Sequence, residues 1–259
     1  MSHRLLLRRH LLGAALLGVA TLFLAVGDGR ASSLIIHVED SFGTMYDIID
    51  QLPPDTNPGL NAIQADTTTL IFPNFDLKSL SATSNNPGQA DPKGAFVQVQ
   101  ATVQAITPVA DTLTITAYQT NFNLPTGPSF NLENTSTANY VNVPAGSQTA
   151  EAWYNPASPA VPPPPFGTPA PLVALALAGT NSTSGTTMLT GLPPSTDFSL
   201  TTQMVINLGG VVGAQDTGSS IAQLHAIPEP SSVIMLGTAA PLALVLLSKI
   251  RRVRKRASA

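Results

Sequence analysis

The stretch that decides the fold is residues 94–107, GAFVQVQATVQAIT. From Val97 to Ala105, apolar residues occupy every second position, and glutamine or threonine occupies the positions between them. Because side chains alternate between the two faces of a strand, this pattern places an apolar set on one face and an uncharged polar set on the other. It predicts a β-strand with one buried face and one solvated face.

The same kind of pattern recurs along residues 32–226. Further strand candidates lie at 33–39, 68–72, 75–82, 111–118, 138–143, 148–154, 172–178, 186–190, 198–208 and 219–225. Turn-forming sequences such as NNPG at 85–88 and GG at 209–210 separate them. The best helical candidate is the short segment 44–51. We therefore expect an all-β fold, an antiparallel β-sandwich of the jelly-roll or immunoglobulin-like kind.

Charge and composition exclude some classes of function. The chain has 259 residues, no cysteine and a formal net charge of −3. Between Ala31 and Pro228 only Lys78 and Lys93 are cationic, against 13 acidic residues, so this body carries a net charge of −11. Nucleic-acid binding depends mainly on neutralising phosphates, which this body is unsuited to do. The absence of cysteine excludes disulfides, thiolate nucleophiles and cysteine-ligated metals.

Residues 1–31 have the features of an export signal. Arg4, Arg8 and Arg9 form a basic start, an uncharged apolar run follows at 11–26, and small residues close the segment. This order is typical of a secretory signal peptide, for which residues 29–31 suggest cleavage after Ala31 and residues 25–27 are a second candidate site. The adjacent arginines leave the twin-arginine route open. An uncleaved anchor helix is the plainer alternative. Either interpretation places the following body outside the cytoplasm.

A second hydrophobic segment lies near the C-terminus. Pro228, Glu229 and Pro230 precede an uncharged run at 231–248, and that run is long enough to span a bilayer as a helix. Six cations follow it: Lys249, Arg251, Arg252, Arg254, Lys255 and Arg256. By the positive-inside rule these cations remain cytoplasmic and stop transfer. The residues alone predict a single-span anchor with the body outside.

The order of these features resembles the PEP-CTERM sorting signal of bacterial exosortase substrates. The resemblance covers residues 227–256, with the motif at 228–230, the span at 231–248 and the basic tail at 249–256. It implies that the tail holds the protein in the membrane until an exosortase, a membrane-embedded cysteine transpeptidase, processes it near the Pro-Glu-Pro motif. It also implies a location at the cell surface or in the exopolysaccharide matrix. Segments 112–125 and 197–208 loosely resemble the β-sandwich ectodomains of other members.

A proline-rich segment at 155–171 interrupts the strand pattern. It holds eight prolines in 17 residues, and four consecutive prolines favour an extended polyproline II conformation. The segment is either a linker between two domains or a loop inserted into one sandwich. The chain that follows this segment contains about four predicted strands, which are too few for a stable β core of their own. The inserted loop is therefore favoured.

Residues suited to catalysis are sparse in the body. Only His37 and His225 could serve as a catalytic base there, and the chain has no G-x-S-x-G elbow with a credible base, no H-E-x-x-H motif and no P-loop. His37 and Glu39 share one face of the predicted first strand, with Asp40 next to them, and could ligate a transition metal. Ordinary strand histidines are the favoured interpretation.

Two further groups of residues have binding chemistry. Asp47, Asp50 and Asp55 could offer oxygen ligands to Ca²⁺, but no calcium-loop motif surrounds them, so solvated carboxylates are favoured. Trp153 and Tyr154 could form a sugar-stacking platform, although core or interface packing is favoured for them. We therefore predict no catalytic, cofactor-binding or metal-binding residue.

The sequence thus predicts an exported, non-enzymatic surface or extracellular-matrix protein in three parts: a signal peptide at 1–31, a β-sandwich at 32–226 and a sorting signal at 227–256. Its expected partners are the export machinery and an exosortase, the membrane before processing, and exopolysaccharide, but no nucleic acid. One alternative is a carbohydrate-binding surface module. A second is a surface hydrolase that uses His37 or His225.

Overall fold

The computed structural model describes residues 34–90, 93–143, 146–156, 168–169, 173–176, 182–193, 195 and 197–227. These residues form an all-β fold with two antiparallel sheets, as predicted, and one 3₁₀ helix, η1 at Thr67–Thr69. The expected signal peptide, the motif Pro228, Glu229 and Pro230, the apolar span and the basic tail lie outside the described residues, as does most of the proline-rich segment. No helix in the described part is both long and apolar enough to cross a bilayer.

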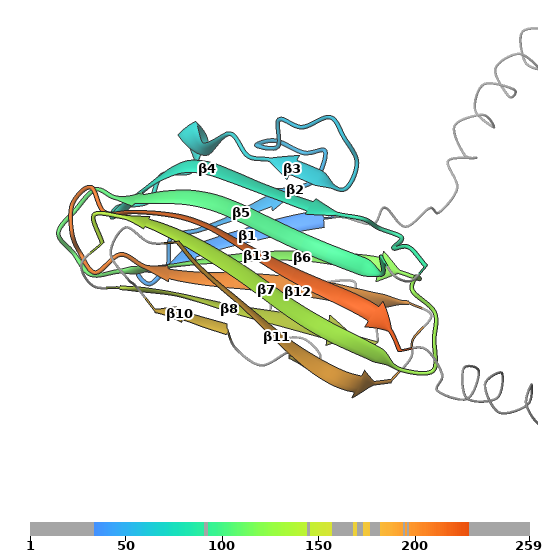
Figure 1. Ribbon diagram of the computed structural model, residues 1–259. Coiled ribbons are helices and arrows are strands. Elements are labelled where there is room, and N and C mark those ends of the chain that lie inside the picture. The colour runs from blue at the N-terminus through green and yellow to red at the C-terminus, as the bar shows by residue number, and fades with distance from the viewer. Residues whose placement is uncertain are drawn as a thin grey trace, which may run out of the picture. The chain divides into compact units, whose positions relative to one another are not determined.

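Figure 1 shows the strands coloured in their order along the chain. Their bounds are β1 Leu34–Asp40, β2 Met45–Ile49, β3 Ala62–Gln64, β4 Phe75–Ser84, β5 Ala95–Ala105, β6 Thr112–Phe122, β7 Phe130–Val141, β8 Ser147–Asn155, β9 Thr168–Pro169, β10 Val173–Ala176, β11 Ser182–Leu192, β12 Phe198–Asn207 and β13 Gln215–Ala226.

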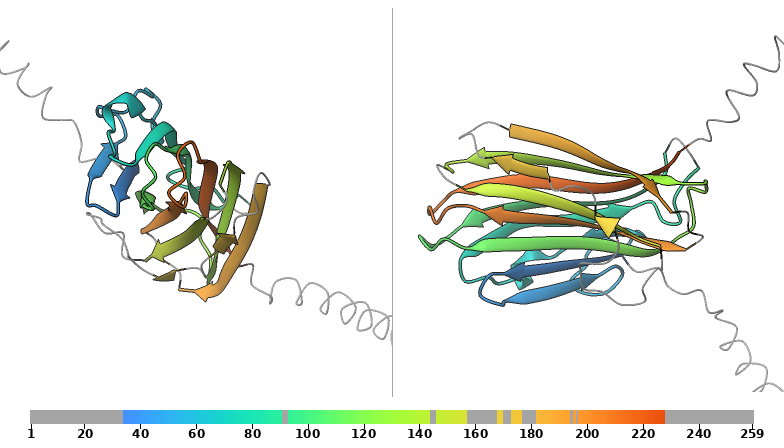
Figure 2. Two further views of the ribbon diagram at one scale, coloured as in Figure 1. Left: turned by 90° about the vertical axis from the view of Figure 1, so that its left-hand side faces the viewer. Right: turned by 90° about the horizontal axis from the view of Figure 1, so that it is seen from below.

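The strands build two layers that stack face to face (Figure 2). The first layer, sheet I, has the order β10-β8-β12-β6-β1-β2, with β9 also paired to β8. The second layer, sheet II, has the order β11-β7-β13-β5-β4-β3. β12 lies between β6 and β8, and β13 lies between β5 and β7. Strands that follow the proline-rich segment therefore share both sheets with strands that precede it.

Alternation along β5 decides which side chains enter the core. Ala95, Val97, Val99, Ala101, Val103 and Ala105 are all buried, whereas the glutamine and threonine side chains between them lie on the outer face of sheet II. Strand β1 of sheet I alternates in the same way. The buried apolar residues of both sheets form one continuous core, and its removal from water is the main force that holds the layers together.

One end of the core is aromatic. The rings of Phe122 and Phe198 stack with centroids 5.4 Å apart, and Phe130 lies edge-on to Tyr154 at 5.9 Å. Phe130 comes from sheet II and its partners come from sheet I, so these rings join the two layers. The Tyr154 hydroxyl donates to the Pro193 carbonyl oxygen at 2.8 Å, which satisfies its only buried polar atom.

The core is polar towards the other end. Gln148 of β8 reaches across to sheet II, where its Nε2 donates to the Ser136 Oγ at 2.8 Å and to the Thr137 carbonyl oxygen at 2.9 Å. Gly218 makes room for this side chain, because a Cβ there would lie 2.1 Å from the Gln148 Oε1. Asp216 is fully buried two residues away on the same strand, and neither of its carboxyl oxygens has a hydrogen-bond partner.

Two local predictions were wrong. The segment 44–51, expected to be helical, contains β2, because its residues pair in register with β1, with Tyr46 opposite Val38. The segment 68–72, expected to be a strand, begins instead in η1. The Asp66 carboxylate caps that helix by accepting from the Thr68 backbone N–H at 3.1 Å. At 44–51 the pairing with β1 outweighs the local preference for a helix. At 68–72 the cap from Asp66 outweighs the local preference for a strand.

Candidate functional site

Uncharged polar side chains form rows across the outer face of sheet II. In one row, Ser81 of β4 pairs with Gln100 of β5, Gln100 with Ser219 of β13, and Ser219 with Thr137 of β7. In the next row, Ser79 pairs with Thr102, and Thr102 with Thr217. Antiparallel pairing brings these side chains side by side even though they are far apart in the sequence.

The two rows border a shallow groove of about 310 Å³. Within the rows, the Oγ1 atoms of Thr102 and Thr217 lie 3.3 Å apart, and the Thr137 Oγ1 lies 2.6 Å from the Ser219 Oγ. The lining consists of hydroxyl and amide side chains with the backbone at Ala101 and Gly218, and no charged side chain takes part: Ser79, Ser81, Gln100, Ala101, Thr102, Thr137, Thr217, Gly218 and Ser219.

The chemistry of this groove is that of a neutral hydrogen-bonding surface. Each hydroxyl can donate one hydrogen bond and accept two, and Gln100 adds an amide that does both. Such a surface matches a ligand that carries many hydroxyl groups. It gives no Coulombic preference for an anionic or a cationic ligand.

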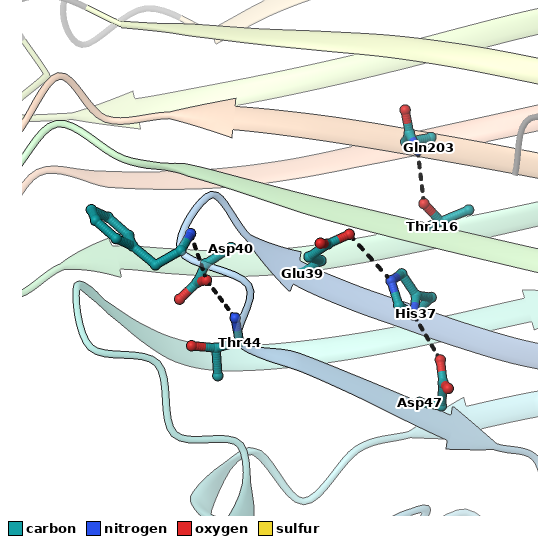
Figure 3. A network of polar contacts seen from close by, with 8 residues as sticks. His37, Glu39, Asp40, Thr44, Asp47, Thr116 and Gln203 are labelled. Atoms are coloured by element: carbon teal, nitrogen blue, oxygen red, sulfur yellow. Dashed lines mark hydrogen bonds and ion pairs between the residues drawn. The ribbon is translucent and has the colours of Figure 1, made fainter. Parts of the chain in front are cut away.

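A second polar network lies on the outer face of sheet I (Figure 3). His37 of β1 faces two carboxylates: its Nδ1 lies 2.7 Å from the Asp47 Oδ1 of β2, and its Nε2 lies 3.6 Å from the Glu39 Oε2. The Glu39 side chain is 46% exposed and the Asp47 side chain 65%. Beside His37 in the register, Thr116 of β6 accepts a hydrogen bond from the Gln203 Nε2 at 3.0 Å.

This network has the geometry of a cluster of polar surface contacts rather than of a nucleophile and its base. Nucleophilic catalysis needs a hydroxyl or thiol within hydrogen-bonding reach of the base. Here both His37 ring nitrogens face carboxylates. His225 lies on β13 in the other sheet, where it is paired with Asn131, so the two histidines belong to opposite outer faces of the sandwich.

The other carboxylates singled out in the sequence serve turns. Asp40 is buried and accepts from the backbone N–H groups of Phe42 and Thr44, at 3.0 and 2.8 Å, in the β1–β2 turn (Figure 3). Asp50 accepts from the Asn61 backbone N–H at 2.7 Å, and Asp55 accepts from three backbone N–H groups. No group of three or more candidate metal-binding side chains converges within the described ranges.

Trp153 and Tyr154 are packing residues, as favoured from the sequence. Trp153 is 5% exposed beside the β8–β9 pairing, and Tyr154 is fully buried in the aromatic end of the core. A sugar-stacking platform needs an exposed ring face, which neither residue offers. The carbohydrate-binding alternative therefore loses the aromatic site that was proposed for it.

The comparisons with known proteins assign no family. No protein-family model matches the chain, and no curated protein matches it. Among solved structures, the chain is similar to an arabinose-bound α-L-arabinofuranosidase, MgGH51, with 10% identity and a TM-score of 0.30, over 68% of this chain and 25% of that one. This chain thus spans a quarter of that enzyme.

Two carbohydrate-binding modules give similar values. TmCBM61, solved in complex with β-1,4-galactotriose, shows 12% identity and a TM-score of 0.26, over 61% of this chain and 90% of that one. TmCBM27, described for specific mannan recognition, shows 10% identity and a TM-score of 0.30, over 63% and 98%. At these scores the likeness locates no site in this chain.

The sequence indicated part of the sheet II face. The alternation along β5 predicted a polar face made of Gln98, Gln100, Thr102 and Gln104, and two of these, Gln100 and Thr102, line the groove. The hydroxyls of β4, β7 and β13 were missed, because only the strand order and register show that they are neighbours.

Proposed function

We propose that this protein is an exported, non-enzymatic surface or matrix protein whose sheet II face lies against neutral exopolysaccharide. The observation that carries this proposal is the groove of about 310 Å³ lined by hydroxyl and amide side chains with no charge among them. A neutral polysaccharide presents many hydroxyl groups and exchanges hydrogen bonds with such a surface without the cost of desolvating an ion.

Charge supports a neutral glycan over an acidic one. The body has a net charge of −11, so a uronate or sulfated polymer is repelled at low salt. A neutral glycan is not subject to this repulsion. The groove in the centre of sheet II brings no carboxylate against the ligand.

Export and sorting are proposed from the sequence. The apolar segment at 1–31 would direct export, and the Pro-Glu-Pro motif with the span at 231–248 and the basic tail would hold the protein in the membrane for an exosortase. Processing near Pro228, Glu229 and Pro230 would release the sandwich to the surface or matrix.

The glycan contact is tested by affinity electrophoresis through gels that contain a neutral polysaccharide, galactomannan or dextran, or the acidic alginate. We expect retardation in a neutral gel and none in alginate. The double variant Thr137→Val/Thr217→Val removes two groove hydroxyls at nearly constant volume. Each lost hydrogen bond is worth about 0.5–1.5 kcal/mol, so the affinity of the double variant falls by about 5-fold to 150-fold.

The matched control is Thr114→Val/Thr149→Val, which removes two hydroxyls from the outer face of sheet I. If sheet II is the contact face, this control variant binds the neutral polysaccharide with the affinity of the unaltered protein. Equal weakening by both double variants, or no retardation of the unaltered protein in any neutral gel, overturns the proposed contact.

Sorting is tested by the intact mass of the protein recovered from the cell surface and the medium. A C-terminus within residues 228–232 supports processing at the motif. A C-terminus at Ala259 indicates a permanent single-span anchor and removes the exosortase from the proposed partners.

A further inference from the structure

Strand β11 forms a long outer edge of sheet II. It spans Ser182–Leu192 and pairs with β7 in unbroken register from Ser182 to Leu189. In the part of the chain that the structure describes, no strand pairs with its other side. An edge of this length offers a row of backbone N–H and C=O groups to a further strand.

The other edges of the sandwich are short or carry protective features. β3 has three residues and β10 has four. The part of β4 that extends past β3 carries Lys78, at a shift in register between Leu77 and Ser79. β2 has five residues and carries Asp47. Charged residues and irregular register are devices that keep sheet edges from pairing with other molecules. β11 has no charged residue and no proline, and its register with β7 shifts only near its end, between Leu189 and Leu192.

The edge also lies in the one long uncharged part of the body. No Asp, Glu, Lys, Arg or His occurs between Glu151 and Asp197, whereas the body as a whole has a net charge of −11. Two copies of this chain repel each other over most of their surfaces. Contact along β11 brings together the uncharged segments of the two copies, which add nothing to the repulsion between them.

We propose that β11 pairs with β11 of a second copy of this chain, antiparallel and about a two-fold axis, so that sheet II continues from one copy into the next. Antiparallel edges are self-complementary under a two-fold axis, which makes a second copy the partner that fits. A contact between hydroxyl groups also joins this edge to the next strand, since the Thr135 and Thr186 Oγ1 atoms lie 3.1 Å apart across β7 and β11. This pairing uses a surface separate from the glycan groove.

The first test is the molar mass of the full chain, measured by sedimentation over a wide range of protein concentration. We expect a monomer–dimer equilibrium. The variant Thr186→Lys/Thr190→Lys places like charges on two exposed positions of β11 and weakens the dimer at least tenfold. The control Thr83→Lys, at an exposed position of β4 on the far side of sheet II, leaves the equilibrium unchanged.

The second test uses the absence of cysteine in the chain. Single cysteines at Thr186, Met188 and Thr190 probe positions around the centre of the edge, and Thr83→Cys is the control. We expect a disulfide-linked dimer from at least one β11 variant under mild oxidation and none from the control. Melting temperatures establish that each variant is folded.

The proposal is overturned if the unaltered protein is monomeric at every concentration, or if it dimerises and the lysine variant dimerises equally well. Neither result bears on the glycan contact, which is read separately by gel retardation. A protein that binds glycan as a monomer keeps the proposed function and loses the β11 pairing.

Discussion

The buried Asp216 predicts a sandwich that loses stability as the pH rises. Its side chain is fully buried in β13, neither oxygen has a hydrogen-bond partner, and burial raises its pKa from 3.8 to about 7. The Asn139 backbone lowers the pKa by a smaller amount without reaching hydrogen-bonding geometry. The titratable group beside it is Tyr140 of β7, whose own pKa is raised by burial and by Asp216.

The size of the stability loss follows from the pKa of Asp216 in the unfolded chain, 3.8, and in the folded chain, about 7. Below about pH 4 the carboxyl is protonated in the folded and the unfolded chain, and it has no effect on the free energy of unfolding. Between about pH 4 and 7 the unfolded chain ionises first, so the folded state loses about 1.4 kcal/mol for each pH unit. Above pH 7 both states are ionised and the loss levels off at about 4 kcal/mol.

Asp216→Asn removes this ionisation and keeps the shape of the side chain. In urea unfolding between pH 4 and pH 9, we expect the variant to match the unaltered protein near pH 4 and to exceed its unfolding free energy by up to about 4 kcal/mol at pH 8. Asp197→Asn, at an exposed position, is the control, and its unfolding free energy falls with rising pH as that of the unaltered protein does. A variant that retains the full slope, or a native protein most stable at pH 8, would refute the reasoning.

Three further variants and one control, Phe42→Ala, test the fold and the sheet I network, each read by urea or thermal unfolding. Gly218→Ala places a Cβ 2.1 Å from the Gln148 Oε1, and the overpacking costs about 1–3 kcal/mol; an unchanged midpoint contradicts this close approach. Phe198→Ala removes a buried ring from the aromatic end and costs about 3–5 kcal/mol, whereas Phe42→Ala, at a 64% exposed position, changes stability by less than about 0.5 kcal/mol. His37→Ala costs about 1 kcal/mol or less, because its two carboxylate partners are largely exposed to water and such contacts contribute little, and a larger loss would mean that the cluster is structural.

The sequence predicted those strands that carry a strict alternation. Along β5 each buried residue follows from a pattern of period two that needs no partner to be recognised. β3 was missed and β7 was found only in its last part. β7 places Asn134 and Ser136 on its buried face, which breaks the apolar pattern that identifies a strand. Those two residues are accommodated by long-range hydrogen bonds, such as that from the Asn134 Nδ2 to the Ala150 carbonyl oxygen.

The candidate site was harder to predict than the strands. Sequence reasoning selected residues by chemical type, and so it examined His37, Trp153 and the aspartates. The groove instead consists of common serines and threonines whose importance comes from adjacency across four strands. Adjacency of this kind depends on strand order, and strand order is set by contacts across the whole sandwich rather than by any local motif.

The position of β13 determines how the sandwich would carry a mechanical load. β13 is the last described strand, and it is bonded to β5 over Gln215–Leu224 and to β7 over Gln215–Ala226. Tension from a tail at its end pulls along the strand, so it strains the hydrogen bonds on both sides together instead of opening them one at a time. A protein tethered through this strand would resist drag from flowing water or a swelling polymer gel better than one tethered through an edge strand.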